Sequence, residues 1–126
     1  MARPFDIRER SFLFACEVVS AFPTERPLDP PSWRVWQQLV AAGTSVGAHL
    51  EEAEAASSRA HFVSLNRGAL RELREARYWL RLIAATKLRG HEGIATLEVE
   101  ARELVAILTT IVKRASAGTE TRRQSR

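Results

Sequence analysis

The segment PTERPLDPP, residues 23–31, holds four of the five prolines in this chain of 126 residues. Each proline lacks an amide donor and has a fixed φ angle, so a helix cannot run through this density of prolines. We therefore predict a loop over residues 23–31 that separates two helices. Ser32 follows the loop directly and is placed to cap the second of these helices.

Apolar residues recur at the three-four spacing of an amphipathic helix in four stretches of the chain. One stretch precedes the proline segment and three follow it. The predicted helices span residues 6–22, 32–55, 58–86 and 94–111. Ser57 or Ser58 is expected to cap the third helix, and Gly90 and Gly93 bracket the turn before the fourth.

Four amphipathic helices with mostly short connections pack most simply as an up-down antiparallel four-helix bundle, so the predicted fold class is all-α. A chain of this length can bury a core without disulfides or a structural metal. We predict one bundle domain over residues 1–116 and a flexible basic tail over residues 117–126. The tail is predicted because the closing segment SAGTETRRQSR contains no apolar residue other than alanine.

The single cysteine, Cys16, can form no internal disulfide, which favours a reduced, cytoplasmic location. We expect Cys16 to be a small buried hydrophobic residue rather than a nucleophile. No apolar run approaches the roughly 20 residues of a membrane span. The first residues, MARPFDIRER, carry charges where a signal peptide would need its apolar region, so we expect no export.

His49 and Glu52 lie three residues apart on the predicted second helix and superficially suggest a metal site. A di-metal bundle needs a Glu-x-x-His pair on each of two helices and a Glu on each of the other two. Here His precedes Glu, and the sequence contains no second pair. We therefore predict no metal, no cofactor, no catalytic residue and no small-molecule substrate, and we expect the chain not to be an enzyme.

The same polar residues suit a structural role instead. Ser45, His49 and Glu52 form a polar stripe that can hydrogen-bond a neighbouring helix or subunit, and we group Glu72 of the third helix with them. A partly buried Glu52 would need an arginine partner such as Arg67 or Arg71. Beside this stripe, Gly43 and Gly47 are one helical turn apart, which suits close approach of another helix.

The net charge of +4 is distributed unevenly along the chain. Residues 58–89 contain eight basic residues and two acidic ones, whereas residues 1–57 contain five basic residues and eight acidic ones. Within the basic segment, five arginines recur at steps of four, three, three and four, which places them on one flank of the third helix. They are Arg67, Arg71, Arg74, Arg77 and Arg81.

This row of arginines predicts a surface that binds nucleic acid. A surface serving only solubility would mix charge signs more evenly. Arginine forks bind phosphate oxygens bidentately, and Tyr78 or Trp79 among them could stack on a base. Binding of RNA or DNA would be electrostatic and would weaken steeply with salt.

Three alternatives remain open at this point. The arginines could form an ordinary solvated face, and Tyr78 and Trp79 could pack at the edge of the core or at a subunit contact. The acidic end of the second helix, residues 51–54, could also pair with the arginines of a neighbouring subunit. In that case the chain would be a protein-interaction scaffold that does not bind nucleic acid.

Three segments resemble the bacterial four-helix-bundle proteins of the 23S rRNA intervening-sequence, or S23, family. These segments are FDIRERSFLFACEVVSAFP (5–23), SVGAHLEEA (45–53) and SRAHFVSLNRGALREL (58–73), and the resemblance covers about residues 5–112. The positions that match the family pattern are Ser45, Ala48, Glu52, Ser58, Phe62, Gly68, Leu70, Glu72 and Leu73. The positions that depart from it are Gly47 for proline, His49 for asparagine, Ala53 for glycine, His61 for glutamate and Ala69 for serine.

The resemblance implies a non-enzymatic four-helix bundle. It also implies a likeness to the accessory proteins of diversity-generating retroelements, which are homopentamers with basic surfaces that engage nucleic acid or a reverse transcriptase. A homo-oligomer, with a pentamer favoured, is therefore the assembly expected for this chain. The cellular task of most members of the family is unassigned.

Overall fold

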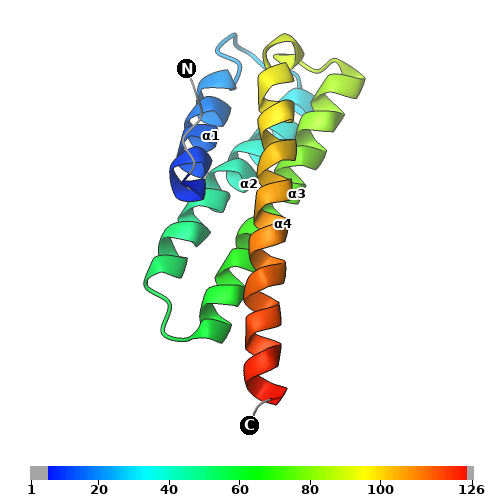
Figure 1. Cartoon of the computed structure of the whole chain (residues 1–126). Helices are drawn as coiled ribbons and strands as arrows, with labels where there is room; N and C mark the ends of the chain where they lie inside the picture. Colours follow the sequence, from blue (N-terminus) through cyan, green and yellow to red (C-terminus); the bar gives the residue numbers. More distant parts are fainter. Residues whose placement is uncertain (1–5, 125–126) are drawn as a thin grey trace.

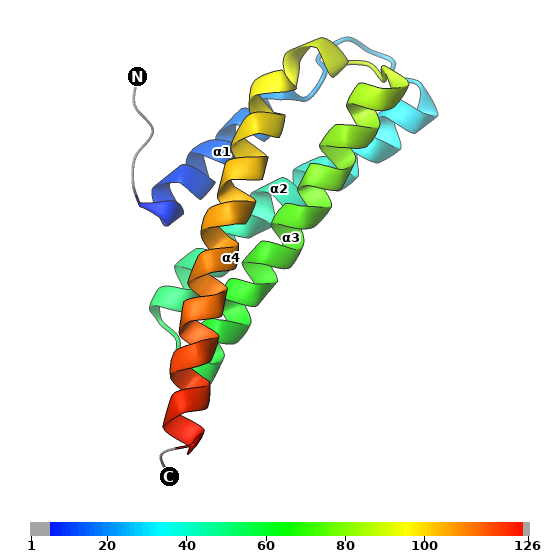
Figure 2. The same ribbon diagram turned by 45° about the vertical axis from the view of Figure 1, so that its right-hand side comes forward.

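The computed structural model describes residues 6–124, with side chains described as far as Gly118. Its helices are α1 (Ile7–Ala21), α2 (Pro30–Glu54), α3 (Arg59–Thr86) and α4 (Ala95–Gln124), and a short 3₁₀ turn, η1 (His91–Gly93), precedes α4. Consecutive helices pack against each other, and α1 also contacts α4, which closes an antiparallel four-helix bundle (Figure 1). Figure 2 shows α3 and α4 lying side by side. The predicted all-α bundle is confirmed.

The core comes from the apolar stripe of each helix. Its largest fully buried side chains are Phe14, Val18, Trp36, Leu39, Val46, Leu73, Leu80, Ile83, Ile94, Leu97, Leu104 and Leu108. The indole of Trp36 donates a hydrogen bond of 2.6 Å to the carbonyl oxygen of Arg89. None of the described helices combines the length and apolarity needed to cross a membrane.

The start of α2 differs from the prediction. The helix begins at Pro30, two residues earlier than expected, and Asp29 rather than Ser32 is its N-cap. The carboxylate of Asp29 accepts a hydrogen bond of 3.1 Å from the amide of Ser32, and hydrogen bonding from Ser32 lowers the pKa of Asp29. Prolines are tolerated there because amides in the first turn have no intrahelical acceptor. The buried hydroxyl of Ser32 instead accepts a hydrogen bond from the amide of Arg89.

The other connections follow the sequence pattern more closely. Ser58 caps α3, as predicted, by accepting a hydrogen bond of 3.0 Å from the amide of His61. Gly90, in the turn before α4, has a φ of +89°. A Cβ atom there would also lie 2.9 Å from the Trp36 ring. Glycine is therefore required at this position by both backbone conformation and space.

The close approach predicted at Gly43 and Gly47 is confirmed. A Cβ at Gly43 would lie 3.1 Å from the side chain of Val18, and a Cβ at Gly47 would lie 3.7 Å from the backbone of Ser11 and Phe12. Both glycines thus lie where α1 packs on α2. A larger residue at Gly43 would displace the side chain of Val18, whereas a Cβ at Gly47 would make an ordinary van der Waals contact with the backbone of α1.

One expectation at the periphery, the burial of Cys16, was wrong. Cys16 is exposed, because it lies on the outer flank of α1, two residues away from both Phe14 and Val18, which face the core. Helix α4 continues to Gln124, through most of residues 117–126, and the flexibility expected of that segment stays a prediction. Gly118 is the residue least favourable to a helix in that segment, and one glycine costs about 1 kcal/mol relative to alanine without ending a helix. Residues 125–126 lie outside the described part.

Candidate nucleic-acid interface

The five predicted arginines share the outer flank of α3. The opposite flank of the helix buries Leu73, Ala76, Leu80 and Ile83 completely. Arg77 is half-buried, and the other four arginines are exposed. From Arg67 to Arg81 the row extends about 21 Å, at 1.5 Å of rise per residue. We call these five residues the arginine ridge.

Most of the arginine ridge has no carboxylate partner. Arg67 donates a hydrogen bond of 2.9 Å to the hydroxyl of Ser116 on α4. Among residues 6–118, the side chains of the other four ridge arginines form no ion pair and no hydrogen bond. Glu72 and Glu75 lie on the same helix but do not come within ion-pair distance of the ridge.

Three arginines elsewhere in the bundle form ion pairs with carboxylates within the described residues. Arg8 pairs with Asp6 and with Glu54, and Arg89 pairs with Glu25. Arg10 donates to both Glu100 and Glu103. The carboxylates that form ion pairs thus neutralise arginines on α1 and before η1, and the charge of the ridge is left uncancelled.

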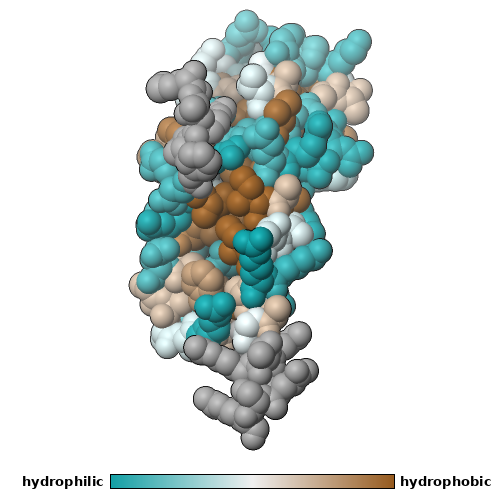
Figure 3. Space-filling model, viewed as in Figure 1, coloured by the Kyte–Doolittle hydropathy of each residue, from teal (hydrophilic) through white to brown (hydrophobic). Residues whose placement is uncertain are grey.

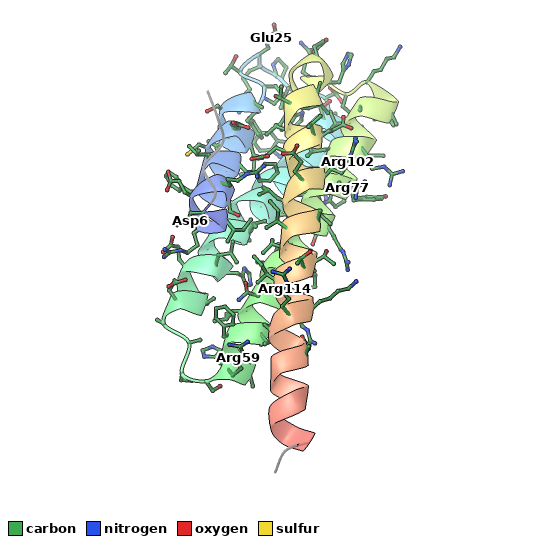
Figure 4. All side chains as sticks on the ribbon, viewed as in Figure 1. Asp6, Glu25, Arg59, Arg77, Arg102 and Arg114 are labelled. Carbon is green, nitrogen blue, oxygen red and sulfur yellow. The ribbon has the colours of Figure 1, made fainter. Side chains whose placement is uncertain are left out.

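A sixth arginine extends this basic surface onto α4. Figure 4 shows Arg102 of α4 and Arg77 of α3 on the same side of the molecule. Arg102 is exposed and, within the described residues, has no ion pair. Sequence reasoning missed this residue because its proximity depends on how the antiparallel helices α3 and α4 are aligned, and no local pattern encodes that alignment.

Two shallow hollows lie along the ridge. The first, of about 420 Å³, lies between α3 and α4 and is lined by Arg67, Leu70, Arg71, Arg74 and Val112. The second, of about 230 Å³, is lined by Tyr78, Arg81, Leu82 and Ala85. Both combine guanidinium groups with apolar side chains.

Tyr78 and Trp79, adjacent in sequence, have different environments. Trp79 is half-buried and packs against the core, as the edge-packing alternative predicted. Tyr78 is 54% exposed and lies among the arginines. The two rings meet edge to face, with centroids 5.1 Å apart and an interplanar angle of 75°. Trp79 therefore supports the ring of Tyr78 from the core side.

The predicted polar network of Ser45, His49, Glu52 and Glu72 does not form within one chain. The hydroxyl of Ser45 donates to the carbonyl of Ala41, and Nδ1 of His49 lies 2.8 Å from the carbonyl oxygen of Ser45. Glu52 is exposed, Glu72 is half-buried, and neither has a hydrogen bond or ion pair within the described residues. Ser45 and His49 thus each contact the carbonyl oxygen four residues earlier in α2, instead of bonding a side chain of another helix.

Sequence reasoning also missed a buried charge cluster. Arg10 of α1 reaches two carboxylates of α4. Its Nε donates to Oε2 of Glu100 at 3.3 Å, and its Nη2 donates to Oε1 of Glu100 and, at 2.8 Å, to Oε2 of Glu103. The carboxylate of Glu100 is almost completely buried, and its hydrogen bond raises the pKa of Arg10. Glu100 lies between Leu97 and Leu104 on the apolar side of α4. A charge at such a position signals a buried partner.

The comparisons with known proteins bear on this bundle as a whole. The model of a family described as 23S rRNA-intervening sequence protein matches residues 3–110. The chain belongs to this family. The resemblance predicted from residues 5–112 is thereby confirmed. The family therefore includes a member in which His49 replaces the usual asparagine and Gly47 the usual proline.

A solved structure gives the same picture. The chain is similar to a protein of unknown function from the S23 ribosomal protein family of Bacteroides thetaiotaomicron. The two are 30% identical, the match covers 86% of this chain and 99% of the other, and the TM-score is 0.74. No curated protein matches the chain.

Gly68, one of the positions that match the family pattern, has a physical explanation in this structure. Gly68 of α3 faces His49 of α2, and a Cβ atom at Gly68 would lie only 2.7 Å from Cδ2 of His49. Gly68 therefore makes room for the side chain that replaces the asparagine of the family pattern. The preceding residue, Arg67, begins the arginine ridge, so a close helix contact and a basic side chain lie one residue apart.

Proposed function

We propose that this chain is a non-enzymatic, homo-oligomeric bundle protein that binds RNA or DNA through the arginine ridge. One observation carries the proposal. Arg71, Arg74, Arg77 and Arg81 lie along one helix flank with no carboxylate partner in the described residues, while arginines on α1 and before η1 are paired. An uncancelled row of guanidinium groups has a large affinity for phosphate oxygens.

The mechanism is electrostatic. Each guanidinium group that neutralises a phosphate releases a condensed counterion, so affinity falls with salt. Five such contacts give a slope of log K against log salt of about −4.5 for duplex DNA and about −3.5 for a single strand. Binding needs no cofactor or metal and is suited to the cytoplasm. Phosphate contacts of this kind position the ligand without reading its sequence.

The test compares two double variants with the same change in net charge. The ridge variant is Arg71→Glu with Arg74→Glu. The control is Arg34→Glu with Arg114→Glu. Arg34 lies on α2, and Arg114 lies on a different side of α4 from Arg102 (Figure 4). Fluorescence anisotropy over a range of salt should show the salt slope reduced by about two units in the ridge variant and unchanged in the control. Equal losses in both variants, or no binding by the wild-type chain at low salt, would overturn the proposal.

A second candidate is a scaffold in which subunit contacts occupy the ridge. It is favoured by the exposed carboxylates of Glu51 and Glu52, which have no ion pair in the described part of the chain and could face the ridge of a neighbouring copy. The ridge variant would then dissociate the oligomer, which native mass spectrometry detects. The two uses can coexist if part of the ridge stays open, and a ring of copies would then bind a polyanion with greater avidity.

A further inference from the structure

We propose that the hollow beside Tyr78 holds one unpaired nucleobase, so that the arginine ridge binds single-stranded RNA or DNA in preference to duplex. The inference rests on the proposed function and adds the class of ligand to it. It depends on the position of Tyr78, on the residues that surround its ring and on the shape of the ridge.

Tyr78 has no evident role in stabilising the bundle. The residue is 54% exposed, and the contact of its ring with Trp79 is edge to face. Exposing the apolar surface of an aromatic ring to water is unfavourable in free energy, and exposed aromatic residues are typical of recognition sites. The ring is nevertheless held in place, because Trp79 behind it packs against the core.

The surroundings of the ring suit a planar ligand. Leu82 follows Tyr78 by one turn and Ala85 by two, and with Arg81 they line the hollow of about 230 Å³. Because Ala85 is small, no side chain at that position covers the hollow. A base could stack on Tyr78 and contact the methyl groups of Leu82 and Ala85, since every base has an apolar face.

The charges on either side of Tyr78 suit the backbone of the same strand. Arg74 lies one turn before Tyr78, and Arg81 lies one turn after it at the edge of the hollow. Neither has an ion pair among the described residues. The phosphates before and after a stacked base would therefore each meet a free guanidinium group.

A duplex cannot use this site in the same way. The faces of its bases are covered by their neighbours in the stack, so Tyr78 could reach only base edges. The ridge also follows one flank of α3 over about 21 Å, whereas each strand of a duplex winds around the duplex axis and leaves the ridge. A flexible single strand can follow the ridge and turn one base into the hollow.

The test uses the full chain with labelled single-stranded RNA, single-stranded DNA and duplexes of the same sequence, at one low salt concentration. Tyr78→Leu should weaken binding of both single strands at least about fivefold and leave duplex binding unchanged, because stacking of one base is lost. Tyr78→Phe keeps the ring and should bind within about twofold of the wild type. Phe12→Leu, which replaces an exposed ring on α1 with another apolar side chain and so keeps that surface apolar, is the matched control and should change neither.

A second arm keeps the phosphates and removes the bases. A single strand of abasic nucleotides should bind the wild-type chain as weakly as the ordinary strand binds Tyr78→Leu, and Tyr78→Leu should weaken abasic binding no further. Losses that add would overturn the inference. A wild-type chain that binds duplex and single strand equally through the ridge would refute this inference while leaving the proposed function standing, and absence of all binding would refute both. The RNA and DNA arms show whether the 2′-hydroxyl contributes.

Discussion

The guanidinium group of Arg10 links α1 to α4 by pairing with a carboxylate that is buried beside the core. Its partner Glu100 is only 2% exposed, and both oxygens of that carboxylate accept from Arg10. Burying two charges has a large desolvation cost, which their attraction and hydrogen bonds offset. Removal of one member leaves the other buried without its partner. The arginines of the ridge are in the opposite situation, because water already solvates them.

This difference predicts the effect of a substitution. Arg10→Leu should lower the free energy of unfolding by about 3 kcal/mol, because it leaves the Glu100 carboxylate buried without its arginine. Combining it with Glu100→Leu should recover most of that loss. Urea denaturation measures both. Arg8→Leu is the control, since its pairs are exposed and worth about 0–1 kcal/mol. An Arg10 variant no less stable than the Arg8 variant would contradict the explanation.

The ordinary spacing of apolar residues was enough to predict four helices and their order, because each helix must bury one stripe. Helix ends were harder to predict. The start of α2 depends on Asp29 capping two prolines that the sequence pattern assigned to the loop, and α4 continues past Gly118 because no proline follows. In the candidate site, too, local spacing could be predicted from the sequence and contacts between distant helices could not. The flank shared by the five arginines follows from their spacing, whereas Arg102 and the Arg10–Glu100 pair depend on how distant helices pack.

The contact between α2 and α3 at His49 and Gly68 gives a prediction at the scale of these elements. Gly68→Ala gains up to about 1 kcal/mol of helix propensity. Its Cβ atom would nevertheless force the His49 ring to move and to lose its hydrogen bond with Ser45. We expect Gly68→Ala to destabilise the wild-type chain but to stabilise the His49→Ala variant. Thermal unfolding of the four proteins measures this change of sign, and the same sign in both backgrounds would show that the two side chains do not compete for space.

At the scale of the whole molecule, apolar and basic surfaces lie on different sides. Helix α1 is only 15 residues long, about half the length of the 28-residue α3, so it flanks only one part of the bundle (Figure 1). Figure 3 shows apolar surface gathered between α1 and α4 on this face. Three of the exposed large hydrophobic residues, Phe12, Val19 and Trp33, also belong to α1 and α2. The arginine ridge is on α3.

This separation predicts which face the proposed oligomer uses. If copies meet through the apolar residues of α1 and α2, Phe12→Asp with Val19→Asp should give monomers by sedimentation, because each introduces a charge at a dry contact. Each monomer would keep its ridge and its salt slope per site but bind a long strand more weakly, since the avidity of several linked ridges is lost. Conversely, if Arg71→Glu with Arg74→Glu dissociates the oligomer and the apolar variant does not, the ridge is the subunit contact. In that case the scaffold function would replace nucleic-acid binding.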